Sequence, residues 1–426
     1  MKDIKISLFE MILEFAEIFS YVNGKIHSHL YDVGYIVMRI LEKMEQFDED
    51  KKIEIIMAAL LHDIGALKDS EKERLLKFEV NDFERHERIG FFLLNSHEPF
   101  YNIAYIIRYH HVKWNKIKED ISVPAGSYII SLADRFSVLL NENKKYFEVK
   151  NEILDTINKE SGKSFDPELV SILNELAKEE AFWLDIVYGD KKSLIYNKYK
   201  DKIKINCLKD ILGFGKIISF VIDFRDRFTA IHTTGVAHIL KEIAAILGYS
   251  EKEQEYLSLA GFLHDIGKLA VPVEILDKRG ALTEQEFEII KSHAYHSYRI
   301  ISRIKGFEEL AEIAAYHHEK LNGNGYPFHI NYEKLSIEAR MMAVADVFTA
   351  LSEKRPYRER MKKEQIIDIL DNMVKLKHLD KDIVEVVKEN YENLEKLNIY
   401  IQKELLEELK LIDEFIYYAN GELLEK

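Results

Sequence analysis

The chain has 426 residues, of which 60 are lysine or arginine and 74 are aspartate or glutamate, so its formal net charge at pH 7 is −14. This acidic balance argues against broad binding to nucleic acid or to an anionic membrane, so an anionic substrate needs a local site. The 6 prolines favour long helices, and the single cysteine, Cys207, excludes an intrachain disulfide and a thiolate metal cluster. We therefore expect an all-α, cytoplasmic protein without a signal peptide or a membrane span.

In the first half of the chain, an amphipathic helix is predicted to run into the pair His62-Asp63. Its apolar residues follow the spacing of one helix face: Ile53, Ile56, Met57, Leu60 and Leu61. Gly65 fits a helix stop, which places the pair at a helix end. Further on, Asp166-Pro167 fits an N-cap and a first-turn proline, so we predict a helix from about Glu168 to Ala181 that closes the first lobe.

The second half repeats this arrangement. The same stripe is formed by Tyr256, Leu259, Ala260 and Leu263. It leads into His264-Asp265, and Gly267 again fits a helix stop. The segment from Leu394 to Lys426 predicts an additional helix, either packed on its own lobe or forming the contact of a homodimer. We divide the chain into two domains, residues 1–200 and residues 201–426.

The histidines reveal the repeat most clearly. Five histidines and two aspartates occur in one order in each half, and these sets contain ten of the 16 histidines. The first set is His29, His62, Asp63, His86, His110, His111 and Asp134, and the second is His232, His264, Asp265, His293, His317, His318 and Asp346. Two unrelated sets would rarely share this order, so we predict that each set binds metal.

Imidazole and carboxylate ligands without thiolate suit iron or manganese, with zinc and nickel as alternatives. Seven ligands are too many for one tetrahedral ion, so two divalent ions are expected in each lobe. The carboxylate of a His-Asp pair can bridge two ions about 3.5–4 Å apart. Such ions activate water and neutralise phosphate oxygens, which suits the hydrolysis of a phosphodiester.

Two features of the second half suit a phosphate substrate. Lys268 follows Asp265 by three residues and can reach a phosphate oxygen or protonate the leaving oxygen, so we predict that both residues are catalytic. In the first half, Ala66 takes the position of Lys268. After the paired histidines, a loop with two glycines permits close approach of the backbone to a ligand, and its predicted substrate-binding residues are Gly323, Gly325 and Tyr326.

The run His-His-Glu-x-x-x-Gly-x-Gly-Tyr-Pro, from His317 to Pro327, resembles the signature of HD-GYP phosphodiesterases, a branch of the HD superfamily of metal-dependent phosphohydrolases. The resemblance extends from about Arg225 to Val387. It implies a helical domain that hydrolyses cyclic di-GMP to pGpG or GMP, with the second set of seven residues as ligands. It also implies phosphate contacts by Lys268, Arg355 and Arg358. Phe228 stands where members with a third metal carry glutamate, so two ions are expected.

The first half resembles the wider HD superfamily, so the expected architecture is a tandem of HD-type helical bundles. It is not an HD-GYP domain. Its interval from His111 to Asp134 is 134 − 111 = 23 residues, against 346 − 318 = 28 in the second half, and it has Val112-Lys113-Trp114 in place of the loop. We expect this lobe to bind metal and to act as a regulatory or second catalytic module.

Two alternatives remain open at this point. The substrate can be another cyclic dinucleotide or a nucleotide phosphate. Alternatively, the metal centres can report redox state, oxygen or metal supply, in a signalling protein whose hydrolysis is absent or incidental.

Overall fold

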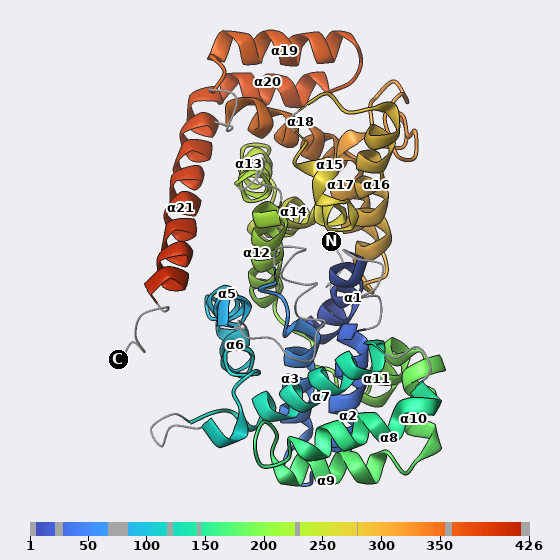
Figure 1. Cartoon of the computed structure of the whole chain (residues 1–426). Coiled ribbons are helices and arrows are strands. Elements are labelled where there is room, and N and C mark those ends of the chain that lie inside the picture. Colours follow the sequence, from blue (N-terminus) through green and yellow to red (C-terminus); the bar gives the residue numbers. More distant parts are fainter. Residues whose placement is uncertain are drawn as a thin grey trace. The chain divides into compact units, whose positions relative to one another are not determined.

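The computed structural model describes residues 6–21, 29–66, 84–116, 122–142, 146–225, 231–278, 280–353 and 360–418. Within these ranges every regular element is a helix and no strand is formed, which confirms the all-α prediction (Figure 1). The chain separates into two compact units, one of residues 9–204 and 415–426 and one of residues 1–8 and 205–414. None of the described helices is long and apolar enough to cross a membrane.

The N-terminal unit is built from helices that surround α2 and α7. Its elements are α1 (Leu8–Tyr21), α2 (His29–Glu42), α3 (Glu49–Leu61), α5 (Glu84–Leu94), η1 (Glu98–Phe100), α6 (Tyr101–Arg108), η2 (Trp114–Lys116), α7 (Ala125–Glu142), α8 (Tyr146–Lys159), α9 (Pro167–Leu176), α10 (Glu180–Tyr188) and α11 (Lys191–Tyr199). Helix α3 begins where the Asp48 side chain accepts a hydrogen bond from the backbone N of Lys51 at 2.8 Å. Its buried face packs on α2 and α6, which fixes the helix end where His62 lies.

The predicted helix from Glu168 to Ala181 is wrong in its length. Asp166 caps α9 as expected, because its Oδ1 accepts from the backbone N of Glu168 at 2.8 Å. The helix ends at Leu176, however, and α10 begins at Glu180 after a short turn. The turn redirects the chain so that Phe182 and Trp183 are buried, and the Trp183 indole donates to the carbonyl of Ala177 at 2.9 Å.

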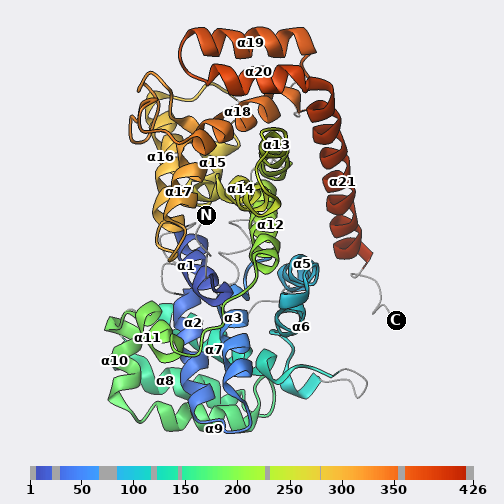
Figure 2. The ribbon, with the colours of Figure 1, turned by 180° about the vertical axis from the view of Figure 1, so that it is seen from behind.

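The C-terminal unit is also helical throughout its described residues. Its elements are α12 (Leu208–Arg225), α13 (His232–Ile246), α14 (Glu251–Leu263), η3 (Ile266–Ala270), α15 (Val273–Leu276), α16 (Glu284–Ile301), α17 (Glu308–Ala315), η4 (Tyr316–His318), α18 (Ile337–Ser352), α19 (Lys363–Lys375), α20 (Lys381–Glu389) and α21 (Tyr391–Tyr418). Helices α13 and α14 pack most closely, and a Cβ added to Gly261 would lie 2.4 Å from the Cα of Ala237. Helix α12 packs on both, and the view from behind shows the three helices next to one another (Figure 2).

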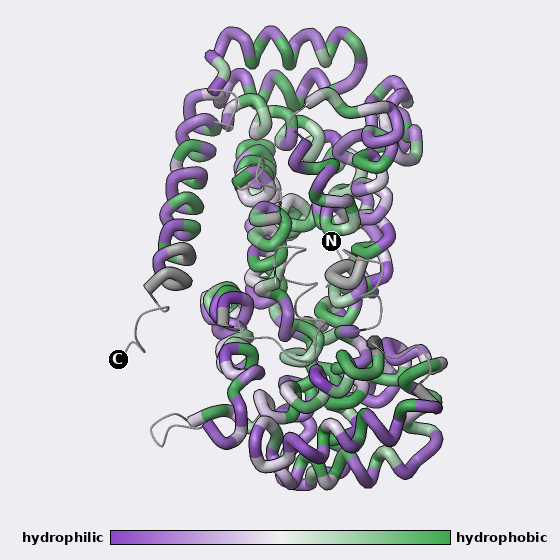
Figure 3. The backbone as a smooth tube through the Cα atoms, viewed as in Figure 1, coloured by the Kyte–Doolittle hydropathy of each residue, from purple (hydrophilic) through white to green (hydrophobic). Residues whose placement is uncertain are grey.

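Helix α21 confirms that the chain continues as a helix after Leu394, as far as Tyr418. One side of it carries buried residues such as Ile401 and Leu405, whereas Tyr400 and Leu411 are more than half exposed. Figure 3 shows this mixture of hydrophobic and hydrophilic residues along the helix. The homodimer contact stays a prediction.

Candidate metal centres

The structure brings together the seven predicted ligands of the C-terminal unit from separate elements. His232 begins α13, His264 caps α14 and is followed by Asp265, His293 lies on α16, His317 and His318 lie on η4, and Asp346 lies on α18. They form two groups of three in which the candidate ligand atoms lie within 4.8 Å of one another: His293, His317 and His318, and His232, His264 and Asp346. Each of these groups could hold a metal ion, and the number of ions stays a prediction.

Asp265 lies between these groups. Its Oδ2 is 3.2 Å from Nε2 of His264, and its Oδ1 is 3.3 Å from Nε2 of His293. The two oxygens of one carboxylate therefore face different groups, as a ligand shared by two ions requires.

The orientation of the imidazole rings also fits a metal centre. Nδ1 of His264, His293 and His317 contacts the carbonyl oxygen three residues earlier, at 2.7, 2.5 and 2.8 Å. A carbonyl oxygen only accepts hydrogen bonds, so Nδ1 carries the proton and Nε2 presents a lone pair.

Two such lone pairs face each other, because Nε2 of His293 is 3.4 Å from Nε2 of His317. Burial and the nearby His264 hold the pKa of His317 at about 3, so protonation does not relieve this repulsion at neutral pH. The buried Nε2 of His264 also has no hydrogen-bond partner among the described residues. A divalent cation accepts the lone pairs of such a set of unprotonated imidazole nitrogens.

One lysine, Lys268, forms an ion pair with Asp265. Lys268 Nζ lies 2.6 Å from Oδ2 of Asp265. Although burial alone would raise the pKa of Asp265, Lys268 and His264 hold it well below its ordinary value. Lys268 is thus placed beside the predicted bridging ligand.

Sequence reasoning missed one carboxylate at this centre, that of Glu353. His232 lies between Asp346, at 2.9 Å from Nε2 to Oδ1, and Glu353, at 3.4 Å from Nδ1 to Oε2. Burial alone would lower the pKa of His232, but Glu353 and Asp346 raise it to about 10. The residue type of Glu353 gave no signal, because surface glutamates are common at helix ends.

The glycine loop lies against the paired histidines. The backbone N of Tyr326 donates to the carbonyl of His318 at 3.2 Å, and the two rings are 4.7 Å apart between centroids. A Cβ added to Gly325 would lie 2.4 Å from the Cα of Glu319, and Gly323 has a φ of +78°. The loop therefore needs both glycines where the sequence suggested.

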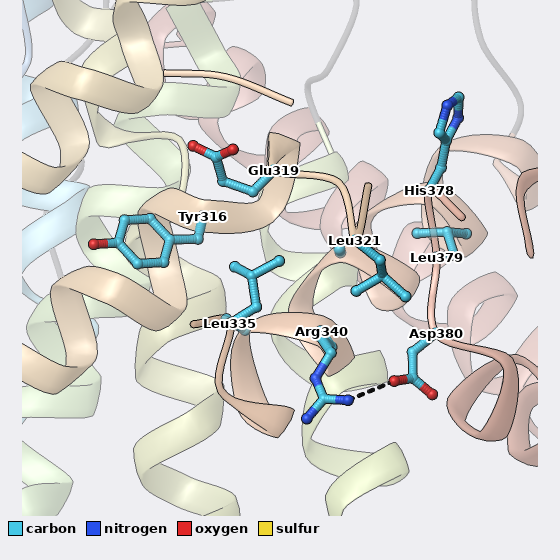
Figure 4. Close-up of a pocket in the computed structure, with 10 residues that line it drawn as sticks. Tyr316, Glu319, Leu321, Leu335, Arg340, His378, Leu379 and Asp380 are labelled. Atoms are coloured by element: carbon cyan, nitrogen blue, oxygen red, sulfur yellow. Dashed lines mark hydrogen bonds and ion pairs between the residues drawn. The ribbon is translucent and has the colours of Figure 1, made fainter. Parts of the chain in front are cut away.

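Glu319, which sequence reasoning did not select, fixes this loop. It is 2% exposed, and its two carboxylate oxygens accept from the backbone N of Phe328 at 2.7 Å and of Ile330 at 3.0 Å. Behind the loop is a small pocket that Glu319 lines together with Tyr316, Arg340 and Asp380, and the last two form an ion pair at 2.7 Å (Figure 4). The pocket contains none of the predicted ligands. The predicted phosphate contacts Arg355 and Arg358 lie outside the described residues, as does Phe228.

The N-terminal unit repeats this geometry. His86, His110 and His111 form one group, and His29, His62 and Asp134 form another. Nε2 of His86 lies 3.3 Å from Nε2 of His110, and Nδ1 of His62 and His110 again contacts the carbonyl three residues earlier, at 2.8 and 2.6 Å. Asp63 faces both groups, with Oδ1 at 3.6 Å from His86 and Oδ2 at 3.4 Å from His62. Both predicted ligand sets are therefore assembled.

The two centres differ in their charged neighbours. Ala66 replaces Lys268, and a different cation is present: Arg135 donates through Nε and Nη2 to Oδ2 of Asp134, at 3.0 and 2.7 Å. Glu87 is buried and accepts from the backbone N of His111 at 3.0 Å. The sequence comparison of the two halves did not select Arg135 or Glu87.

The interpretation of Gly65 and Gly267 as helix stops is wrong. The helices end at Leu61 and Leu263, and neither glycine is among the described glycines with positive φ. Instead, an added Cβ would lie 2.1 Å from the carbonyl oxygen of His86 at Gly65, and 1.9 Å from that of His293 at Gly267. The glycines let each turn lie directly on the helix that carries the third histidine of its set.

Ser297, four residues after His293 on α16, strengthens this contact in the C-terminal unit. Its buried hydroxyl donates to the carbonyl of His264 at 2.7 Å and accepts from the backbone N of Gly267 at 2.9 Å. The serine thus ties α16 to the turn that carries Asp265.

Comparison with known proteins agrees with this geometry. Residues 26–139 and residues 216–383 each match a family described as HD domain. The 3'3'-cGAMP-specific phosphodiesterase 1 of Vibrio cholerae is 29% identical over 388 residues, which cover 87% of this chain and 89% of that protein. A cyclic di-GMP phosphodiesterase of Thermotoga maritima is 39% identical over 145 residues, which cover 34% of this chain and 39% of that protein.

A solved structure supports the fold. The crystal structure of a cyclic GMP-AMP specific phosphodiesterase of Vibrio cholerae, V-cGAP3, matches 90% of this chain and 97% of its own chain, with a TM-score of 0.61 and 24% sequence identity. The chain therefore contains two HD domains and is homologous to phosphodiesterases of the HD-GYP type.

Proposed function

We propose that the C-terminal centre is a metal-dependent phosphodiesterase that hydrolyses a cyclic dinucleotide, and that cyclic di-GMP is converted there to pGpG, GMP or both. The observation that carries this proposal is the pair of facing lone pairs on His293 and His317 beside Asp265 and Lys268. The names of the homologues support it, since those named above are cyclic dinucleotide phosphodiesterases.

In this proposal, His293, His317 and His318 hold one ion, and His232, His264 and Asp346 hold the other, with Asp265 shared. Iron or manganese is the proposed metal, because the ligands are imidazoles and carboxylates. Bound divalent ions supply positive charge for the phosphate and lower the pKa of water.

The chain's own residues then complete the site. Lys268 presents an ammonium group beside Asp265, where it neutralises a non-bridging phosphate oxygen or protonates the leaving ribose oxygen. Tyr326 and the glycine backbone form the wall next to His318, so they orient the substrate. Arg355 and Arg358 are proposed phosphate contacts because a guanidinium matches phosphate oxygens.

The test replaces the shared carboxylate in each lobe. Protein purified without oxygen is analysed for metal and assayed for release of pGpG and GMP from cyclic di-GMP. We expect Asp265→Asn to abolish hydrolysis. Asp63→Asn tests the N-terminal lobe, since loss of hydrolysis in Asp265→Asn alone makes the N-terminal lobe non-catalytic. Metal-loaded wild-type protein that hydrolyses no cyclic dinucleotide would refute the proposal.

A second substrate, 3'3'-cGAMP, is favoured by one observation. The match to the Vibrio cholerae protein named for it covers 87% of this chain, whereas the match to the cyclic di-GMP phosphodiesterase of Thermotoga maritima covers 34% of this chain. A competition assay with both nucleotides separates the candidates through the ratio of their kcat/KM values. With either nucleotide, the partner is a small molecule, and we place the reaction in the cytoplasm.

A further inference from the structure

An exposed aromatic side chain stands beside the glycine loop of the C-terminal unit. Phe287, on α16, is 43% exposed. Its ring centroid lies 6.5 Å from that of Tyr326, and the ring planes meet at 78°. Lys291 Nζ lies 4.8 Å from the centroid of Phe287 and 5.9 Å from that of Tyr326. Two aromatic rings and one cation therefore form a continuous surface.

This surface leads outward from the metal centre. Tyr326 packs on His318, with ring centroids 4.7 Å apart, and the half-exposed ring of Phe287 in turn contacts Tyr326. Phe287 also precedes His293 by six residues on one helix, a separation of about 9 Å along the helix axis. In a cyclic dinucleotide each base is one ribose away from a phosphate. When a phosphate of the substrate is bound at the proposed metal centre, the neighbouring base would therefore reach this surface.

We propose that Phe287 stacks on a purine base of the substrate and that Lys291 contacts the acceptor edge of that base. This inference rests on the proposed function. Stacking on an aromatic face stabilises any nucleobase, and a lysine ammonium pairs with O6 and N7 of guanine. Lys291 is held in place by an ion pair with Glu288, at 2.6 Å from Nζ to Oε1. In this proposal, Phe287 and Lys291 together recognise guanine, the base that cyclic di-GMP and 3'3'-cGAMP share.

A purely structural role for Phe287 predicts a different outcome. If the ring only supported the loop, its loss would move Tyr326 and His318 together, because these residues share a hydrogen bond and a ring contact. Metal content and kcat would then fall. A base contact, in contrast, changes KM and leaves metal content and kcat in place.

The test compares Phe287→Ala, Phe287→Trp and Ile289→Ala in the full-length, metal-loaded protein. Ile289 is 40% exposed on the same helix, and two positions along a helix point to different faces, so its variant is the matched control. With cyclic di-GMP and 3'3'-cGAMP, we expect Phe287→Ala to raise KM by about five- to one-hundred-fold, the range for loss of one stacked base. We expect kcat and metal content within twofold of wild type, KM restored by tryptophan, and no change in Ile289→Ala.

The inference is overturned if KM of Phe287→Ala stays within twofold of wild type. It is also overturned if metal content falls in parallel with activity, or if tryptophan does not restore KM. The wild-type protein tests the proposed function separately. If it binds metal but hydrolyses neither nucleotide, the phosphodiesterase proposal fails, and the proposed contact between Phe287 and a base fails as well.

Discussion

Replacing Gly267 by alanine tests the metal centre without altering a ligand. The added Cβ would lie 1.9 Å from the carbonyl oxygen of His293 and 2.7 Å from the backbone N of Ser297. Both are backbone atoms of α16, so no side-chain rotation can relieve the contact. The helix and the turn carrying Asp265 must therefore separate.

The size of this separation follows from ordinary contact distances. A Cβ contacts other atoms at about 3.4 Å or more, so relief requires a movement of 3.4 − 1.9 = 1.5 Å. Nε2 of His293 is 3.3 Å from Oδ1 of Asp265, and a shift of this size breaks up a set of ligands that must bind the same ions. A misplacement of about 1 Å can cost about 100-fold in rate, and overpacking typically costs about 1–3 kcal/mol in stability. We expect Gly267→Ala to lose at least about 100-fold in kcat and part of its metal.

The N-terminal unit supplies the matched control. A Cβ at Gly65 would lie 2.1 Å from the carbonyl oxygen of His86, so Gly65→Ala should disturb its own centre to a similar extent. Gly280→Ala is a neutral control, because, apart from its chain neighbours, no described residue has an atom within 4 Å of the Cβ that it adds. Steady-state turnover of cyclic di-GMP, metal analysis and thermal unfolding are measured for all three variants. Retention of full metal and of a rate within threefold of wild type by Gly267→Ala would refute the reasoning.

Three further variants probe the surroundings of the ligands. Lys268→Gln should lower kcat by about 100- to 1000-fold without loss of metal, which kinetics and metal analysis together would show. Gly325→Ala places a Cβ 2.4 Å from the Cα of Glu319, so chemical denaturation should show a loss of about 1–3 kcal/mol and kinetics a higher KM. Although burial alone would lower the pKa of His232, Glu353 and Asp346 raise it to about 10. The proton on His232 therefore stabilises the fold, and chelator-treated protein should lose stability as the pH rises from 6.5 to 10, where this proton dissociates. Glu353→Gln should flatten that decline in a series of melting temperatures.

The sequence was sufficient to predict the helical fold and which histidines and aspartates lie together, because both depend on patterns along the chain. The apolar stripe that ends at Leu263 identified the buried face of α14, and the structure places His264 directly after that helix. Recurrence of the same seven residues in each half predicted which side chains meet. Spacing alone did not give the role of Gly267, since a glycine stop and a glycine at a close contact look identical in sequence.

Residues that act through tertiary contacts could not be predicted in this way. Glu319 is a glutamate within a motif, and only the folded loop shows that its oxygens accept from Phe328 and Ile330. The break between α9 and α10 depends on the burial of Phe182 and Trp183, which local helix propensity does not contain. Such features follow from packing rather than from pattern.

The two lobes show how one arrangement of ligands can be adjusted by its neighbouring charges. In the C-terminal unit, Lys268 lies 2.6 Å from Oδ2 of Asp265, the carboxylate that faces both groups of histidines. In the N-terminal unit, Arg135 donates through Nε and Nη2 to Oδ2 of Asp134, the last residue of the seven. Although burial alone would raise the pKa of Asp134, Arg135 and His29 hold it well below its ordinary value. The position of this cation therefore distinguishes the proposed catalytic centre from its N-terminal counterpart, although both contain the same seven residue types.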